Sequence, residues 1–181
     1  LSGPPQSIPP LPYRPFAPIL ELISGLGEAR RFGSCQGEVL RADEGIDLKW
    51  TAEGTGRCGQ RIALHRDGLP TDLLSYQRLR IRGRAEGRVV VAADDLAGYR
   101  GENNVPLATV SGAFDITVPL QEIGRRLDLR YVMALVVSTE AGSARISFDR
   151  IEVVREPAEN RQSGGIGFWV WRYRTAIENP E

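Results

Sequence analysis

Short runs of apolar residues, either alternating with polar ones or continuous, follow one another between Gly33 and Val154. Glycine, aspartate and proline separate the runs, and hardly any helical periodicity lies between them. Runs of this length and spacing are typical of an antiparallel sandwich or barrel. We predict strands at roughly 37–41, 46–52, 59–65, 76–83, 87–93, 105–109, 113–118, 131–138 and 144–154.

Three of these runs have a distinct pattern. The runs 87–93 and 131–138 are continuously apolar, which predicts central strands. In the run 76–83 the alternation is regular, with Leu79 and Ile81 on one face. The opposite face of that strand carries Arg78, Arg80, Arg82 and Arg84.

In the last run, "ISFDRIEVV" at residues 146–154, the alternation of apolar and polar residues shifts by one position. Its apolar residues fall on even positions before residue 149, but Ile151 and Val153 fall on odd positions. A period of two that slips by one residue predicts a β-bulge, and bulges re-aim side chains and occur near sites. Asp149, which stands at the slip, is therefore a candidate ligand.

The two ends of the chain differ in composition from this body. Residues 1–18 hold seven of the twelve prolines, which remove backbone donors, so we predict an extended arm. Residues 19–30 are predicted to form a short helix or turn, stopped by Gly25 and Gly27. The predicted organisation is an arm with a helix or turn at 1–32, a β-sandwich domain at 33–155, and a linker with an aromatic tail at 156–181.

Charge and cysteine content narrow the class of protein. The 23 basic and 23 acidic residues balance, so we predict no nucleic-acid binding. Cys35 and Cys58 are compatible with one disulfide worth about 3 kcal/mol, and two free buried thiols are the alternative. No apolar run reaches the length of a membrane span. The chain begins without Met, and we expect a periplasmic or secreted protein from which a leader or anchor was removed.

Three segments follow one another within about residues 46–154: "LPTDLLSYQRLRIRGRAEGRVVVAADDLAG", "GAFDITVPLQEI" and "LDLRYVMALVVSTEAGSARISFDRIEVV". In this order they resemble the galactose-binding-like jelly-roll domains. The similarity is to the carbohydrate-binding module family 11 type and to the complex I intermediate-associated protein type. The resemblance implies an all-β, antiparallel jelly-roll β-sandwich, and it is a pattern of strands rather than a catalytic signature.

The resemblance also implies a structural calcium ion. In relatives of this fold the aspartate of the last strand often coordinates Ca²⁺, and Asp149 matches that position. Calcium takes about six to eight oxygen ligands, and Glu38, Asp43 and Glu44 are the candidates to complete the set. The alternative is that Asp149 accepts backbone hydrogen bonds or pairs with an arginine at the bulge.

Catalytic groups are sparse along the chain. His65 is the only histidine, and no serine or cysteine stands in a nucleophile motif, so a triad and a zinc site are disfavoured. Asp94 and Asp95 are adjacent and would point to opposite faces of a strand, so we interpret them as a turn. We predict that the protein is not an enzyme.

The arginine face is the first candidate for ligand binding. Arg78, Arg80 and Arg82, with Tyr76 nearby for stacking, offer planar guanidinium groups that suit carboxylates and sugar hydroxyls. A face that is simply solvated is the alternative.

An aromatic sugar platform is the second candidate. Trp50, Tyr99 and Tyr131 have rings that would pack against the apolar faces of pyranose rings. Packing of these aromatic residues in the core is the alternative.

Two functional hypotheses follow. The first is a non-catalytic, lectin-like accessory domain whose partner is a poly- or oligosaccharide. The second is a structural or assembly subunit of a larger complex, held there by its terminal extensions. Membrane association through a removed anchor or a partner is one option for such a subunit. The aromatic residues assigned to that contact are Tyr13, Phe16, Phe168, Trp169, Trp171 and Tyr173.

Overall fold

The structure is a computed structural model of the chain. It describes residues 11–12, 17–22, 29–42, 45–52, 56–64, 69–101 and 104–155, with the backbone alone at 37–42, 45 and 99–101.

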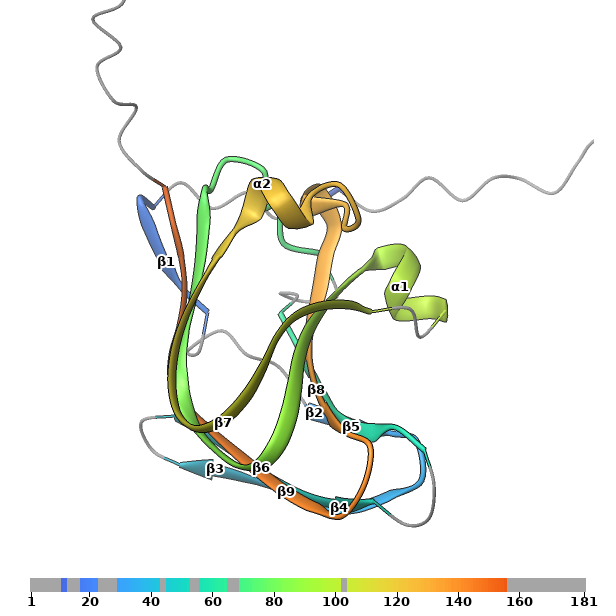
Figure 1. The fold of residues 1–181 in the computed structure, drawn as a ribbon. Helices are drawn as coiled ribbons and strands as arrows, with labels where there is room; N and C mark the ends of the chain where they lie inside the picture. Colours follow the sequence, from blue (N-terminus) through green and yellow to red (C-terminus); the bar gives the residue numbers. More distant parts are fainter. Residues whose placement is uncertain are drawn as a thin grey trace, which may run out of the picture.

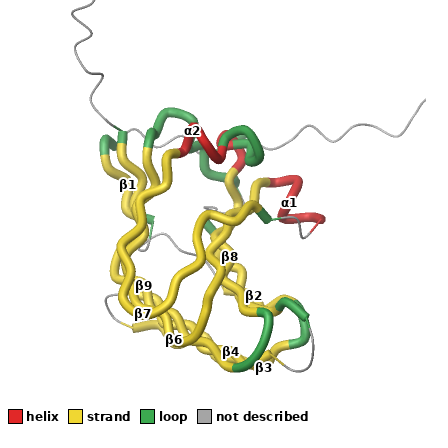
Figure 2. Tube along the Cα trace, viewed as in Figure 1, coloured by secondary structure: helices red, strands yellow, loops and turns green. Residues whose placement is uncertain are grey.

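Nine strands within the described residues form one antiparallel sheet, which is folded over into two layers (Figure 1), and Figure 2 shows that strands dominate. The strands are β1 (Ile19–Glu21), β2 (Ala29–Phe32), β3 (Cys35–Ala42), β4 (Gly45–Ala52), β5 (Cys58–Ala63), β6 (Arg78–Asp95), β7 (Val105–Pro119), β8 (Val132–Thr139) and β9 (Ser143–Val154). Between them lie α1 (Leu96–Gly101), α2 (Leu120–Ile123) and a 3-10 turn at Leu129–Tyr131. The order across the sheet is β2-β5-β8-β6-β9-β4-β3, with β1 on β9 and β7 on β6.

The long strand β6 belongs to both layers. Its first part pairs with β9 from Arg78 to Glu86, and its second part pairs with β8 from Val90 to Asp95. Strand β7 pairs with both parts of β6. Figure 1 shows β6 and β7 bending together from one layer into the other. The two layers are therefore continuous through these strands.

The hydrophobic core fills the space between the layers. Trp50 of β4 and Phe148 of β9 come from one layer, and Ile62 of β5 and Leu135 of β8 come from the other. All four side chains are at most 1% exposed and belong to one buried cluster. Burial of each contributes roughly 1.5–3 kcal/mol. The predicted all-β, antiparallel sandwich is confirmed.

Two glycines accommodate the bend of β6 and β7. Gly87 has φ +84° and Gly112 has φ +69°, in the left-handed region that glycine enters without strain. Between the pairs Ala85–Gly112 and Val89–Val110, β6 has three residues where β7 has one. This irregularity lets the paired strands turn together from one layer into the other.

The bend corrects two of the predicted boundaries. We predicted separate strands at 76–83 and 87–93, and again at 105–109 and 113–118, but each pair is one strand. The chain bends at Gly87 in β6 and at Gly112 in β7 without reversing direction, so each strand continues beyond its glycine. The other predicted strands are present with shifted ends.

The sheet begins nearer the N-terminus than predicted. Where we expected a helix or turn over 19–30, β1 pairs with β9 and β2 pairs with β5. These strands are too short to show alternation, so pairing with a longer neighbour decides their conformation. The aromatic residues assigned to a partner contact, in the arm and in the tail, lie outside the described residues, and that contact stays a prediction.

The predicted bulge in the last strand is confirmed. Gly83 of β6 pairs with Phe148, and the preceding Arg82 pairs with Arg150, so Asp149 is the extra residue. The two strands approach so closely at this point that a Cβ built on Gly83 would overlap the carbonyl oxygen of Ser147. Glycine at position 83 therefore permits the close approach beside the bulge.

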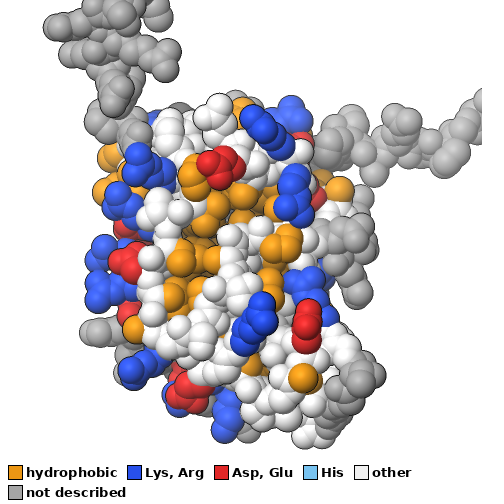
Figure 3. All heavy atoms as spheres, in the orientation of Figure 1, with side chains coloured by type: hydrophobic (Ala, Val, Ile, Leu, Met, Phe, Trp, Pro, Cys, Tyr) orange, Lys and Arg blue, Asp and Glu red, His pale blue; other side chains and the backbone are white. Residues whose placement is uncertain are grey.

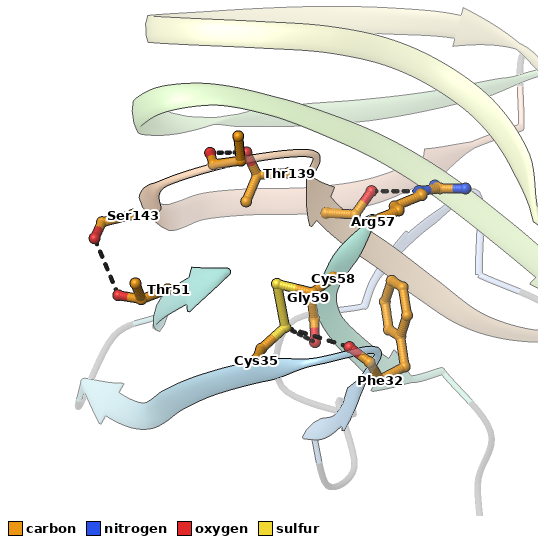
Figure 4. Close-up of a disulfide and its surroundings, with 10 residues drawn as sticks. Phe32, Cys35, Thr51, Arg57, Cys58, Gly59, Thr139 and Ser143 are labelled. Carbon is orange, nitrogen blue, oxygen red and sulfur yellow. Dashed lines mark hydrogen bonds between the residues drawn. A yellow bond between two sulfur atoms is a disulfide. The ribbon is translucent and has the colours of Figure 1, made fainter. Parts of the chain in front are cut away.

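The disulfide between Cys35 and Cys58 is present and ties the start of β3 to the start of β5 (Figure 4). It closes a loop with a sequence separation of 23. In the chain-entropy model a loop of this size is worth about 3 kcal/mol. The sulfur of Cys35 also lies 3.3 Å from the carbonyl oxygen of Phe32, as a van der Waals contact, since a disulfide sulfur carries no proton.

The close approach at Gly83 predicts a strong effect of a single methyl group. We expect Gly83→Ala to lower the free energy of unfolding by about 2 kcal/mol or more, because the methyl group overlaps backbone rather than a flexible side chain. Urea unfolding followed by circular dichroism measures the change. The exposed control Thr117→Ala is expected to change stability by less than about 0.5 kcal/mol. Equal stabilities of the two variants would show that the strands do not approach as described.

Candidate ligand-binding sites

The arginine face lies on the outside of the layer formed by β9, β6 and β7. Its four members are exposed, namely Arg78, Arg80, Arg82 and Arg84. Acidic residues share the face: Arg80 Nη1 lies 3.5 Å from Glu152 Oε1. In Figure 3 basic and acidic side chains alternate along the flank where Figure 1 places β1. The face is accessible to a ligand, and its use in binding stays a prediction.

Two of the aromatic residues singled out from the sequence are buried. Trp50 is 1% exposed and belongs to the core cluster, which was the alternative to a sugar platform. Tyr76 is 3% exposed, and its hydroxyl group donates a hydrogen bond of 2.8 Å to the carbonyl oxygen of Ala17. The guanidinium group of Arg155 lies 5.1 Å from the centre of the Tyr76 ring. Neither ring is open to a sugar, and Tyr76 instead helps to hold the chain before β1 against the sheet.

The other two platform residues lie near a pocket at the end of β6. The pocket has a volume of about 260 Å³ and is lined by Asp95, Leu96, Ala97, Asp128 and Tyr131. We call it the α1 pocket. Tyr99 lies in α1, but its side chain is not described.

One carboxylate joins the two chain segments that form the α1 pocket. Asp95 Oδ1 accepts a hydrogen bond of 2.8 Å from the backbone N–H of Gly98 at the start of α1. Asp95 Oδ2 accepts one of 2.9 Å from the backbone N–H of Asp128. Asp95 and Asp128 are 33 residues apart in sequence. The Asp95 carboxylate therefore holds α1 beside the turn that precedes β8.

Asp128 and its neighbours form the polar side of the pocket. Asp128 caps the 3-10 turn by accepting from the backbone N–H of Arg130 at 3.1 Å, and it also binds the guanidinium group of Arg130 at 3.0 Å. These hydrogen bonds lower the pKa of Asp128 below its usual value, so the side chain is a carboxylate at neutral pH. The guanidinium group also lies 5.7 Å from the centre of the Tyr131 ring. The pocket therefore combines two carboxylates with a half-buried aromatic ring.

The sequence analysis missed the two aspartates of the α1 pocket. We interpreted Asp94 and Asp95 as a turn, but both are the last residues of strand β6, and Asp95 binds backbone N–H groups from there. Asp128 stands directly before the 3-10 turn that leads into β8, and an aspartate is a residue type that often caps a turn. Its proximity to Asp95 has no local signal, because only the fold brings them together.

Asp94 forms a buried ion pair on the outer face of the β5–β8–β6 layer. Its side chain is fully buried, and Arg61 Nε lies 2.8 Å from Asp94 Oδ2. Burial raises the pKa of Asp94 to about 6, and the nearby Arg61 only partly offsets that rise. Beside this pair, Arg57 Nε donates a hydrogen bond of 2.8 Å to Ser138 Oγ (Figure 4).

The calcium site implied by the resemblance is not complete within the described residues. Asp149 is exposed at the bulge, and no group of three or more His, Cys, Asp or Glu side chains that could hold a metal is found in the described part of the chain. Only the backbone of Glu38 is described, and Asp43, Glu44 and His65 lie outside the described residues. Calcium binding therefore stays a prediction.

Known proteins match this chain in fold but not in sequence. No family model matches, and no curated protein matches. A variant of a family 29 carbohydrate-binding module aligns at 10% identity over 80% of this chain and 96% of that chain, with a TM-score of 0.51. The family 11 carbohydrate-binding module of a cellulosomal cellulase of Clostridium thermocellum aligns at 14% identity over 78% of this chain and 96% of that chain, with a TM-score of 0.50. PfGH50B aligns at 10% identity over 83% of this chain and 28% of that chain, with a TM-score of 0.51.

These structures establish the fold class. The chain has the jelly-roll sandwich architecture found in carbohydrate-binding modules, and the predicted resemblance to the family 11 type is confirmed at the level of the fold. Among the helices of the described residues, none has the length and apolar character needed to cross a membrane.

The raised pKa of Asp94 predicts a pH-dependent contribution to stability. The pKa of Asp94 is raised from its usual value of 3.8 to about 6 in the folded state. In the pH range between these two values, the folded state therefore binds the proton more strongly than the unfolded state. The free energy of unfolding therefore falls as pH rises through this window. The amide side chain of the Asp94→Asn variant cannot ionise. We therefore expect the free energy of unfolding of Asp94→Asn to rise by about 1–3 kcal/mol relative to that of the wild type between about pH 4 and about pH 7.5.

Urea unfolding at both pH values measures this difference. The control Thr117→Ala carries no titratable group, and its difference from the wild type is expected to be the same at both. If the Asp94→Asn variant keeps a constant difference from the wild type across the window, the burial of this carboxylate is wrongly assigned.

Proposed function

We propose that this protein is a non-catalytic carbohydrate-binding domain whose ligand occupies the α1 pocket. The observation that carries the proposal is the meeting of Asp95, Asp128 and Tyr131 around a pocket of about 260 Å³. The jelly-roll fold shared with carbohydrate-binding modules supports it.

The chemistry of the α1 pocket suits sugar hydroxyl groups. The carboxylate oxygens of Asp95 and Asp128 have further lone pairs beyond those used in the hydrogen bonds described above. Both carboxylates can therefore accept hydrogen bonds from sugar hydroxyl groups. The ring of Tyr131 offers an apolar surface for a pyranose ring. Pockets for drug-sized ligands have about 300–1,000 Å³. A smaller pocket suits one or two sugar units, with modest affinity.

The proposed location is outside the cytoplasm. A disulfide persists in an oxidising compartment, and Cys35–Cys58 is the disulfide that supports this assignment. We therefore propose a periplasmic or secreted accessory domain that binds poly- or oligosaccharide.

The α1 pocket predicts which substitutions weaken glycan binding. We expect Tyr131→Ala and Asp128→Ala each to weaken retention on the glycan that binds the wild type by about tenfold. Ring stacking is worth about 0.5–1.5 kcal/mol beyond the buried area, and a hydrogen bond to a charged group about 1.5–3 kcal/mol. A glycan array of neutral and uronic-acid-rich saccharides identifies the ligand, and calorimetry gives the affinities. The control Thr117→Ala, on the exposed side of β7, should bind as the wild type does. Failure of the wild type to bind any glycan would contradict the proposal.

A second candidate function is a structural or assembly subunit of a larger complex. It is favoured by β7, which pairs on only one edge within the described residues and whose Leu107, Phe114 and Ile116 are only partly buried. Figure 3 shows apolar side chains gathered inside the bend of β7, below α2. A protein partner would cover this surface and extend the sheet.

Deletion of the terminal extensions tests the second candidate. If the chain ends hold it in a complex, a variant lacking residues 1–16 and 156–181 should lose the proteins that co-purify with the full chain. Co-purification of the same proteins with the shortened chain would count against this function.

A further inference from the structure

The bulge in β9 creates an unusual pairing on the outer face of β6. Because Asp149 is the extra residue, Arg150 lies directly opposite Arg82 in the register of the two strands. Side chains directly opposite one another have Cβ atoms about 4.5–5.5 Å apart, and like charges at such positions are destabilising. Arg84 follows two residues along β6 and points to the same face. The three arginines form what we call the bulge cluster.

The bulge cluster differs from the other arginines of this face. Arg80 is paired with Glu152 at 3.5 Å, and Arg145 is paired with Asp47 and, at 3.9 Å, with Glu86. In contrast, none of the three guanidinium groups of the bulge cluster forms an ion pair or hydrogen bond with a described side chain. All three side chains are exposed. Their donors are therefore available to a ligand.

Two carboxylates border the bulge cluster without pairing to it. Asp115 of β7 lies opposite Arg82 in the register, and Asp149 precedes Arg150. A densely charged polyanion such as a nucleic acid would be repelled by these carboxylates. A sugar acid is different, because each unit carries one carboxylate and several hydroxyl groups. Guanidinium groups bind the carboxylate of such a unit through paired hydrogen bonds, and the carboxylates of the protein accept hydrogen bonds from its hydroxyl groups.

We propose that the bulge cluster is a second glycan-binding surface, selective for acidic saccharides that contain uronic acid units. The inference rests on the proposed carbohydrate-binding function but uses a surface distinct from the α1 pocket. On β6 the arginines stand two residues apart, or about 6.6 Å, along an exposed strand. A ligand therefore lies across the sheet face as an extended chain, and binding weakens as salt concentration rises.

Binding of a defined acidic oligosaccharide tests this inference. The probe is a hexamer of galacturonic acid, compared with its methyl-esterified form and with a neutral glucan hexamer. We expect the wild type to bind the acid form at low salt. The Arg82→Gln/Arg150→Gln double substitution should lower this affinity at least about tenfold, because it removes charged hydrogen bonds to the carboxylates of the ligand. The ester should bind as weakly to the wild type as the acid form binds to the double variant.

A charge-matched control separates the site from overall charge. Arg125→Gln/Arg126→Gln changes two exposed arginines after α2 and alters the net charge equally. Equal loss of affinity in both double variants would overturn the inference, as would equal binding of acid and ester. Binding of only neutral glycans, lost in Tyr131→Ala, would overturn this inference and leave the proposed function standing. Absence of all glycan binding would overturn both.

Discussion

The pairing of β6 along its whole length is the constraint on which the rest of the structure depends. Strand β6 pairs with β9 in one layer, with β8 in the other, and with β7 in both. A conventional sandwich joins its layers through loops, whereas here paired backbone crosses between them. The layers must therefore bend together, and glycine at positions 87 and 112 makes that bend possible. Core side chains from both layers then meet across the bend.

Both candidate binding surfaces depend on β6. Its first half carries Arg82 and Arg84 on the outer face, where the bulge of β9 places Arg150 beside them. Its C-terminal end carries Asp95, which binds the backbone N–H of Asp128 and so determines the shape of the α1 pocket. The two surfaces differ chemically, since one is an exposed basic face and the other is a small pocket with carboxylates. The ligands proposed for the two surfaces therefore differ in charge.

Local pattern was enough to predict most of the sheet, and long-range contact explains what it missed. The change of parity around Asp149 predicted the bulge, because side-chain alternation is a local property of one strand. The helix or turn expected over 19–30 is not present at Ile19–Glu21, because a strand of three residues owes its conformation to its neighbour β9. The α1 pocket could not be predicted, because Asp95 and Asp128 are 33 residues apart and are joined only by the fold. The opposition of Arg82 and Arg150 likewise needed the register between strands, which alternation within one strand does not supply.

Native-state hydrogen exchange of β6 tests the account most directly. If β6 is one strand that joins both layers, its backbone amides paired with β9 and those paired with β8 should exchange with the same free energy, equal to that of global unfolding. The result that would contradict the account is exchange of one half through a separate opening of lower free energy while the other half stays protected. Such a result would mean that the layers are independent units and that β6 does not hold them together.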